Sequence, residues 1–312
     1  MVGCLGACMA AVARASVAWC EAVRSHCGRT APAAGPAPCL DPAVTSGPRR
    51  CAVSVVIPYF QKADTVERAL VSIAGQTVLP AEVIVVDDEG SPSSQEVLRV
   101  LHDRAWPFPI RLMAMPGNGG PAAARNVGWE NTLPGSRYVA FLDADDFWLP
   151  RKLEIQATWM DLHPHIHWTA HRVKRSAAAP APPLDTAPAI RAKRITLLQL
   201  LVRNPVATPS VMIARNSGSR FRDSWRYCED LMLWADLTTG GMCGMMLDIR
   251  LAVLGRPPRS LGGLTADIKA MHTAERQVLE TLRNEHKVSP LSALLLRAIS
   301  WLRYRRRLIM AC

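Results

Sequence analysis

Four apolar runs alternate with helical patterns over residues 51–150, and this alternation limits the possible fold more than any other feature of the sequence. The runs CAVSVVIPYF and AEVIVVDD are rich in Val and Ile and almost continuously apolar, which is typical of strands buried on both faces. Two further strands are predicted over residues 111–115 and 138–142. The order β-α-β-α-β-α-β indicates an α/β fold with a mostly parallel central sheet flanked by helices.

The helical segments carry start and stop signals. Asp64 and Glu67 form a D-x-x-E start box, and Gly75 ends the helix that follows. A polar helix is predicted near residues 94–103, and Pro121 occupies the first position of a third helix. Beyond Pro150 the patterns predict helices at 151–163, 194–204 and 228–239, strands at 165–173 and 207–215, a Pro/Ala-rich loop at 176–189 and a helical tail.

Acidic residues are concentrated where two of the predicted strands end. Asp87 and Asp88 finish the second run, and residues 143–146 follow the fourth. Parallel sheets bind ligands beyond the carboxyl ends of their strands, so both groups lie where a binding crevice is expected. Asp143 and Asp145 face the same side of an extended segment. Two such carboxylates can bind Mg²⁺ or Mn²⁺, ions that take oxygen ligands and are often also bound by substrate phosphates. The alternative interpretation of a lone D-x-D motif is a turn exposed to solvent.

Together these motifs resemble a known family. The segments VSVVIPYF, VERALVSIAGQT, AEVIVVDDEGS, NGGPAAARNVGWEN and YVAFLDADDFWLP follow one another as in the donor-binding half of the family 2 glycosyltransferases. The resemblance runs from about Ala52 to Leu153 and implies the glycosyltransferase A fold. A looser one, through NPVATPSVMIAR and WRYCEDLMLWADL, is to the acceptor half of bacterial members that build surface polysaccharide or lipopolysaccharide core.

For the donor, the resemblance implies three contacts. Pro58 would line the nucleoside pocket, Asp88 would hydrogen-bond the base, usually uracil, and Arg125 would lie near the donor sugar or its diphosphate. Family members usually read DDGS, whereas this chain has Glu89 inserted before Gly90. An extra carboxylate beside the nucleotide therefore distinguishes this chain from the usual pattern.

For the chemistry, the resemblance implies a metal site and a base. Asp145 would be the principal ligand of a divalent metal, Mg²⁺ or Mn²⁺, with Asp143 supporting it through the ribose or a metal-bound water. Asp230 matches the family's catalytic base, and Glu229 lies beside it. A solvated helix position is the alternative interpretation of Asp230, because the dipeptide Glu-Asp is common on helices.

The function implied is that of an inverting, metal-dependent glycosyltransferase. It would move a sugar from a nucleotide-sugar donor, most commonly a UDP-sugar, to a glycan or lipid-linked acceptor in cell-surface polysaccharide or lipopolysaccharide biosynthesis. A catalytically inactive sugar-nucleotide-binding relative is the alternative. The net charge of +11 favours anionic partners, but no nucleic-acid-binding module accompanies it, so no nucleic-acid partner is expected. No G-x-G-x-x-G follows the first strand, which argues against a dinucleotide-dependent oxidoreductase.

Four histidines are spaced closely around a predicted strand: His163, His165, His167 and His171. Alternating imidazoles allow a metal site on one strand face. No other soft ligand is close in the sequence, so ordinary polar positions are the preferred interpretation.

Composition and the resemblance together divide the chain into three parts. Residues 1–50 are predicted to be a poorly ordered extension. The resemblance implies that residues 51–262 form the catalytic domain, with a nucleotide-sugar-binding half (51–150) and an acceptor half (151–262), and residues 263–312 are predicted to form a basic helical tail. The nine cysteines include no C-x-x-C pair, which indicates a reducing compartment, and a cytoplasmic location is expected.

The tail LSALLLRAISWLRYRRRLIM combines an apolar helical face with arginines. Its uninterrupted apolar stretch is shorter than the run of about 20 apolar residues that spans a bilayer, and the segment carries several arginines. The pattern predicts peripheral contact with the anionic inner face of the cytoplasmic membrane. A packing helix with a solvated basic end is the alternative.

Overall fold

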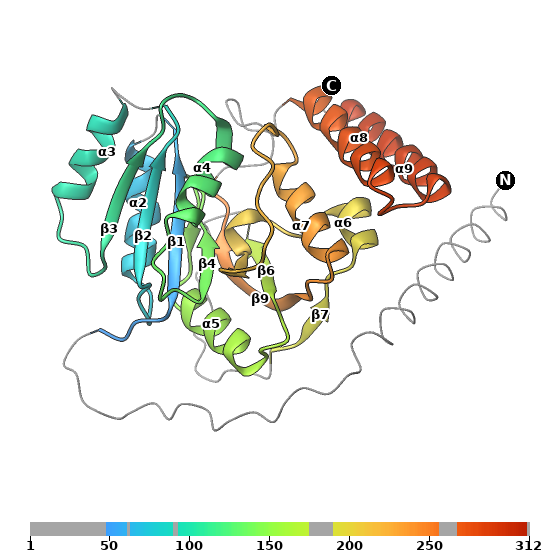
Figure 1. The fold of residues 1–312 in the computed structure, drawn as a ribbon. Helices are drawn as coiled ribbons and strands as arrows, with labels where there is room; N and C mark the ends of the chain where they lie inside the picture. Colours follow the sequence, from blue (N-terminus) through green and yellow to red (C-terminus); the bar gives the residue numbers. More distant parts are fainter. Residues whose placement is uncertain (1–47, 61–62, 90–92, 175–189, 256–266, 311–312) are drawn as a thin grey trace. The chain divides into compact units, whose positions relative to one another are not determined.

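The computed structural model describes residues 48–60, 63–89, 93–174, 190–255 and 267–310. Its first four strands pair in parallel in the order β3-β2-β1-β4 (Figure 1). The predicted alternation is therefore confirmed. The elements are β1 (Val53–Tyr59), α2 (Ala63–Ala74), β2 (Glu82–Asp87), α3 (Ser93–His102), β3 (Ile110–Ala114), α4 (Gly120–Glu130) and β4 (Tyr138–Phe141).

The sheet continues beyond β4 with mixed pairing. Its full order is β3-β2-β1-β4-β8-β6-β9-β5, and β7 pairs with β9. Strand β8 runs antiparallel to both β4 and β6, whereas β6 and β9 are parallel. The elements are β5 (Phe147–Trp148), α5 (Lys152–Leu162), β6 (Trp168–Lys174), β7 (Ala192–Arg194), α6 (Leu197–Arg203), β8 (Met212–Ala214), α7 (Glu229–Thr239) and β9 (Gly244–Val253).

One expectation for this second half needs correction, and one long strand was missed. Residues 207–215 do not form one strand, because a 3₁₀ turn at Thr208–Ser210 precedes the short β8. Pro209 within that turn has no N–H for a strand ladder and favours a turn. The long strand β9 was not predicted, since the charged Asp248 and Arg250 interrupt its apolar pattern.

Alternate residues of the strands are buried in two different cores, each covered by its own set of helices. Val55 and Ile57 belong to one core with α2, α3 and α5, and Val56 belongs to the other with α4, α7 and α8. Gly128 lets α4 approach β1 closely, because a Cβ there would lie 2.3 Å from Val56 Cγ1. Helix α4 is thereby held directly against the strands whose ends form the candidate site.

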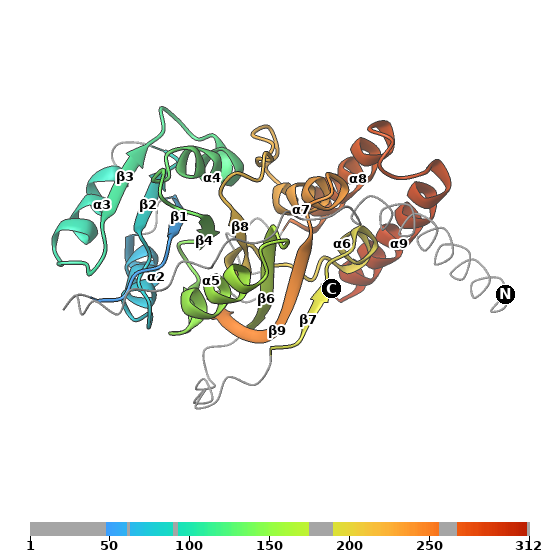
Figure 2. The same ribbon diagram turned by 60° about the horizontal axis from the view of Figure 1, so that its bottom comes forward.

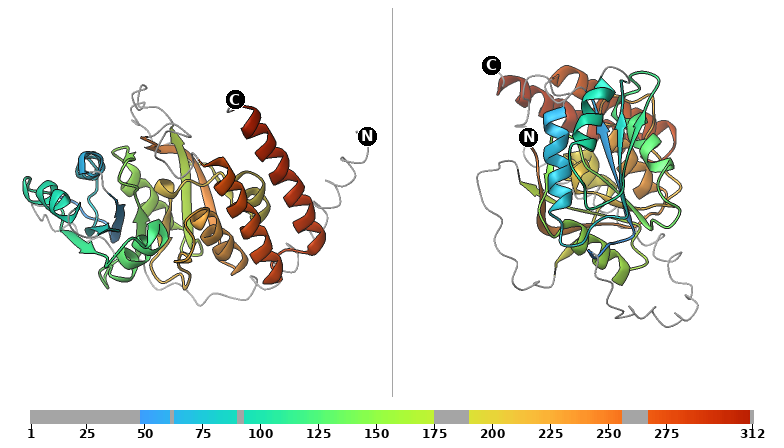
Figure 3. Two further views of the ribbon diagram at one scale, coloured as in Figure 1. Left: turned by 90° about the horizontal axis from the view of Figure 1, so that it is seen from above. Right: turned by 90° about the vertical axis from the view of Figure 1, so that its left-hand side faces the viewer.

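The predicted helical tail consists of two helices, α8 (Ile268–Asn284) and α9 (Pro290–Ile309), which lie side by side (Figures 2 and 3). Ser289 caps α9, and Pro290 opens it. Arg303 of α9 donates to the carbonyl of Val202, 2.7 Å away, so the pair is attached to α6. None of the helices in the described part of the chain is long and apolar enough to cross a membrane. The predicted extension, except residues 48–50, and the loop at 176–189 lie outside the described residues.

Candidate functional site

The expected binding edge forms where β1, β2 and β4 end beside one another. Pro58 and Tyr59 of β1 lie opposite Val86 and Asp87 of β2, and β4 pairs in parallel on the other side of β1. Asp143 follows the end of β4 by two residues. Pro58 is half-buried at this edge. The parallel pairing therefore gathers the acidic groups as the sequence predicted.

Asp88 holds the turn that leads into α4. Its carboxylate accepts hydrogen bonds from the backbone N–H of Gly119, at 2.8 Å, and of Gly120, at 3.0 Å. Gly120 has φ +85°, a conformation that favours glycine. Burial raises the pKa of Asp88 even though these N–H groups oppose the shift. Asp88 therefore positions the glycine turn, a role that its spacing in the sequence did not indicate, and its contact with a base remains a prediction.

Arg125 of α4 joins distant parts of the site. Its guanidinium is 4% exposed and lies 2.7 Å from Asp143 Oδ1 and 3.0 Å from Glu229 Oε1. Its Cζ also lies 5.3 Å from the centre of the Phe221 ring. Burial alone would lower the pKa of Arg125, but the two carboxylates raise it, so the group stays charged. The bridge to Glu229 spans 104 positions, and no local pattern in the sequence indicates it.

Helix α7 presents two carboxylates in its first turn. Cys228 precedes them with φ 55°, a left-handed conformation that is uncommon for a residue other than glycine and costs about 1 kcal/mol or more. Asp230 is half-buried, and its Oδ1 accepts from the N–H of Leu231 at 2.7 Å. Burial and the carboxylate of Glu229 raise the pKa of Asp230 to about 7, although Leu231 and Arg125 oppose the shift. Such a carboxylate is suited to accept a proton near neutral pH.

The segment after β4 brings three carboxylates close together. Asp146 is buried, accepts from the N–H of Gly255 at 2.8 Å, and has a pKa raised to about 8 by burial and by Asp143 and Asp145. Arg68 donates to the backbone carbonyl of Asp145 at 2.6 Å. Gly255 passes so close that a Cβ would lie 1.8 Å from this same carbonyl oxygen. The carboxylate of Asp146 is thus engaged by the backbone of Gly255. Asp145 and Asp143 remain the candidate metal ligands.

The donor set fits a metal that takes further ligands from the substrate. Within the described residues, His, Cys, Asp and Glu side chains form no group of three that could hold a metal ion. Two carboxylates two residues apart match the hard oxygen ligands of Mg²⁺ or Mn²⁺, which commonly complete their shell with phosphate oxygens and water. Binding of a metal by Asp145 and Asp143 therefore remains a prediction.

The histidines of the second half do not converge. His163 Nδ1 lies 2.7 Å from the carbonyl of Trp159, whereas His167 Nδ1 accepts from the N–H of Cys243 at 3.0 Å. His171 is buried, and burial lowers its pKa to about 3. These side chains take part in local packing, in agreement with the preferred interpretation of the sequence.

Bacterial proteins are among those with sequences similar to this chain. The succinoglycan biosynthesis protein ExoW of Rhizobium meliloti is 41% identical over 103 residues, which cover 32% of this chain and 31% of the relative. The UDP-Glc:alpha-D-GlcNAc-diphosphoundecaprenol beta-1,3-glucosyltransferase WfgD of Escherichia coli is 32% identical over 109 residues, covering 35% of this chain and 40% of WfgD. The chain thus matches well under half the length of either relative.

A solved structure shares the fold. The mannosyltransferase PcManGT of Pyrobaculum calidifontis, in complex with GDP-Man and Mn²⁺, superposes with a TM-score of 0.58 at 18% identity. The match covers 94% of this chain and 79% of PcManGT. The glycosyltransferase A fold expected from the sequence is therefore confirmed.

The family model of glycosyl transferase family 2 matches residues 54–220, which include β1 except its first residue, β2 to β4 and the acidic segment after β4. The predicted family is thereby confirmed, and this chain belongs to glycosyl transferase family 2.

Proposed function

We propose that the protein is an inverting glycosyltransferase that moves a sugar from a nucleotide-sugar donor, preferably a UDP-sugar, to a glycan or lipid-linked acceptor. The observation that carries this proposal is the bridge of Arg125 between Asp143 and Glu229, next to Asp230. The bridge supports the proposal because it keeps a charged guanidinium beside Asp143, which follows β4 at the edge where ligands bind in this kind of sheet. Its other partner, Glu229, directly precedes Asp230, whose pKa is raised to about 7.

The reaction is a direct displacement at the anomeric carbon. The acceptor oxygen forms a bond to that carbon as the bond to the leaving diphosphate oxygen breaks, which inverts the configuration. Asp230 takes the proton of the acceptor hydroxyl. Arg125, whose Nε has no hydrogen-bond partner among the described residues, helps to neutralise the negative charge that develops on the diphosphate.

A divalent metal completes the proposed site. Asp145 would hold it, and Asp143 would support it through the ribose or a bound water. When bound, such an ion supplies Lewis-acid stabilisation of the departing diphosphate. The Mn²⁺ in the complex of PcManGT supports this part of the proposal. Pro58 and Asp88 would contact the nucleoside at the ends of β1 and β2.

The acceptor is proposed to be carbohydrate of the cell surface. The names of ExoW and WfgD describe succinoglycan biosynthesis and transfer of glucose to GlcNAc-diphosphoundecaprenol, respectively. By analogy we propose that this chain acts in polysaccharide or lipopolysaccharide biosynthesis, at the inner face of the cytoplasmic membrane. The catalytic domain is proposed to comprise residues 51–262, with donor and acceptor halves that meet near residue 150.

The first prediction tests donor use and metal dependence together. Purified protein is incubated with UDP-glucose, UDP-galactose, UDP-N-acetylglucosamine and GDP-mannose, and release of the nucleoside diphosphate is measured with Mn²⁺, with Mg²⁺ and with EDTA. We expect release from at least one donor, loss of that release in EDTA and its return with added metal. Asp145→Asn should bind the same donor at least about tenfold more weakly, because it loses a charged ligand.

Three results would contradict the proposal. Release that is unaffected by EDTA would exclude the metal role of Asp145 and Asp143. Donor binding without release or transfer would support the inactive sugar-nucleotide-binding relative instead. Absence of binding to all four donors would contradict both.

A further inference from the structure

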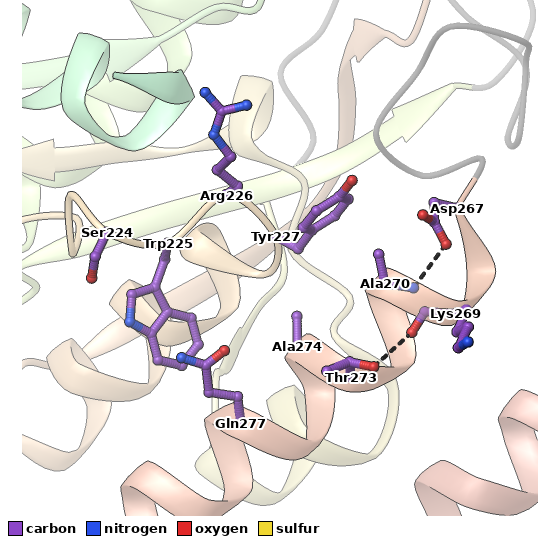
Figure 4. Close-up of a pocket in the computed structure, with 10 residues that line it drawn as sticks. All are labelled: Ser224, Trp225, Arg226, Tyr227, Asp267, Lys269, Ala270, Thr273, Ala274 and Gln277. Carbon is purple, nitrogen blue, oxygen red and sulfur yellow. Dashed lines mark hydrogen bonds between the residues drawn. The ribbon is translucent and has the colours of Figure 1, made fainter. Parts of the chain in front are cut away.

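A hollow of about 530 Å³ opens between the loop that leads into α7 and the first half of α8 (Figure 4). Its size is within the range of small-molecule sites, which are commonly 300–1,000 Å³. The loop contributes residues 224–227, and the next residues along the chain are Cys228, Glu229 and Asp230. The hollow therefore adjoins the segment that carries the proposed base.

The lining combines aromatic rings with polar and charged groups. Trp225 and Tyr227 come from the loop, and Thr273 and Gln277 stand one turn apart on α8. The charged side chains are those of Arg226, Asp267 and Lys269, and Ala270 and Ala274 contribute small side chains. A pyranose has apolar C–H faces and a rim of hydroxyls. Aromatic faces with a hydroxyl or amide partner are the groups that match both surfaces.

The hollow is fixed to the proposed active site from two sides. On one side, Cys228 Sγ lies 4.0 Å from the carbonyl of Met271, which holds the start of α7 against α8. On the other side, Arg226 extends away from α8 (Figure 4) and donates to Asn118 Oδ1 at 2.5 Å. Asn118 precedes the glycine turn that Asp88 holds. The loop that lines the hollow thus contacts the segment before the glycine turn and continues into the helix of the proposed base.

We propose that this hollow binds the acceptor saccharide, the sugar unit whose hydroxyl is glycosylated, and that α8 forms its wall. This inference rests on the proposed transfer reaction and deepens it. Among the described residues, those that line the hollow all lie beyond residue 220, where the match to the family model ends. Residues outside the matched region therefore determine which acceptor binds. They include α8, which the sequence analysis assigned to a separate tail.

The test fills the hollow without touching the donor site. Thr273→Trp and Gln277→Trp each place a large ring on the face of α8 that lines it. Arg276→Trp is the matched control, because Arg276 is exposed on the same helix but does not line the hollow. Each variant is first checked for an unfolding temperature close to that of the wild type.

Binding is measured by saturation-transfer NMR with the methyl pyranosides of glucose, galactose and N-acetylglucosamine, on protein saturated with UDP and Mn²⁺. We expect at least one pyranoside to bind the wild type and R276W. It should bind T273W and Q277W at least about tenfold more weakly, a loss on the scale of a blocked sugar contact. The proposal is wrong if no pyranoside binds the wild type, or if binding survives in both filling variants.

Donor binding and pyranoside binding, measured separately, distinguish failure of this inference from failure of the proposed function. The proposed function requires wild-type protein to bind a nucleotide sugar, which is measured by calorimetry with each of the same four donors, UDP-glucose, UDP-galactose, UDP-N-acetylglucosamine and GDP-mannose, without pyranoside. Donor binding with unaltered pyranoside binding in T273W and Q277W would leave the transferase intact and overturn only the acceptor site. Absence of donor binding would overturn the proposed function itself.

Discussion

Arg125 connects residues that lie far apart in the sequence, and its burial makes that connection energetically important. Asp143 and Glu229 are 29% and 10% exposed, so neither carboxylate is fully compensated by water. Removing one partner of a buried ion pair typically costs 3–5 kcal/mol, because the remaining charges stay buried without compensation. The same contact that positions the active site therefore stabilises the fold.

The second prediction follows at this scale. Arg125→Met should lower the free energy of unfolding by about 3 kcal/mol at neutral pH, measured by urea denaturation. Adding Glu229→Gln should restore part of the loss, because it removes one of the carboxylates that the first change leaves unpaired. Arg220→Met is the control: Arg220 is partly exposed over the Trp129 ring and should contribute about 1 kcal/mol or less. Equal unfolding midpoints for R125M and wild type would contradict the argument.

Residue types at strand ends were predictable from the sequence, and the contacts between distant segments were not. Asp143 and Arg125 were placed at the donor edge from their motifs, and the structure puts them in direct contact. The link of Arg125 to Glu229 depends on how α7 folds back, which no local spacing encodes. Cys228 gave no signal either, since only its positive φ distinguishes it.

At the scale of elements, an ionic network fastens α7 to the turn between α8 and α9. Arg222 lies 2.8 Å from Glu285 and 3.1 Å from Asp236 of α7, and Lys287 lies 2.8 Å from both carboxylates. Two basic and two acidic side chains thus alternate around one junction. Since α8 forms the wall of the proposed acceptor hollow, this junction sets how that wall meets the helix of the base.

The third prediction uses the pH dependence of this network. Arg222 and Lys287 lower the pKa of Glu285 from 4.5 to about 2. A carboxyl group whose folded-state pKa is depressed stabilises the protein above its unfolded pKa and loses that effect as the pH falls toward its folded pKa. Glu285→Gln should therefore destabilise by about 0.5–1 kcal/mol at pH 7, a modest value because the group is partly exposed.

The difference between E285Q and wild type should shrink as the pH falls from about 4.5 to about 2. Thermal unfolding across that range measures it. Glu280→Gln, in the last turns of α8 and with a looser ion pair at 3.8 Å, is the control and should show a smaller difference. A difference for E285Q that stays constant down to pH 2 would show that the charge is not its cause.

Elements with a continuous pattern were predictable, and those that depend on neighbours were not. Strands β1 and β2 are buried at nearly every position, so their apolar runs identify them. Strand β9 alternates buried and exposed positions irregularly, and its pairing with β5, β6 and β7 rather than its composition stabilises it. The tail was predicted as helical, but the break between α8 and α9 depends on a turn in which His286 has φ 56°.

At the scale of the whole molecule, one face of α9 is apolar and unusually exposed. Leu291 and Leu294 are 67% and 64% exposed, and Trp301 and Leu302 are 52% and 61% exposed. Arg305 and Arg306 are exposed near the end of this face, whereas Arg303 and Arg307 form ion pairs with Glu275. We propose that this face lies on an anionic membrane, with Arg305 and Arg306 as its main charges.

The fourth prediction concerns this surface. Wild-type protein should float with phosphatidylglycerol vesicles at low salt, float less at high salt, and bind phosphatidylcholine vesicles weakly. Arg305→Ser/Arg306→Ser should bind the anionic vesicles at least about tenfold more weakly, since each basic residue contributes about 1 kcal/mol at such a surface. Arg276→Ser/Arg283→Ser removes the same charge from α8 and should bind nearly as wild type. Equal losses in both double variants would show that net charge, and not this face, is responsible.

The most direct test of the whole account is the turnover and donor affinity of Asp230→Asn, measured with the donor that the wild type uses best. If Asp230 accepts the proton of the acceptor hydroxyl, turnover of Asp230→Asn should fall about 10²–10⁴-fold while its donor affinity stays within about threefold of the wild-type value. Wild-type turnover should also decline as the pH falls below about 7, the raised pKa of Asp230, because the base is then protonated. Retained turnover, or loss of donor affinity in place of turnover, would contradict the assignment of Asp230 as the base.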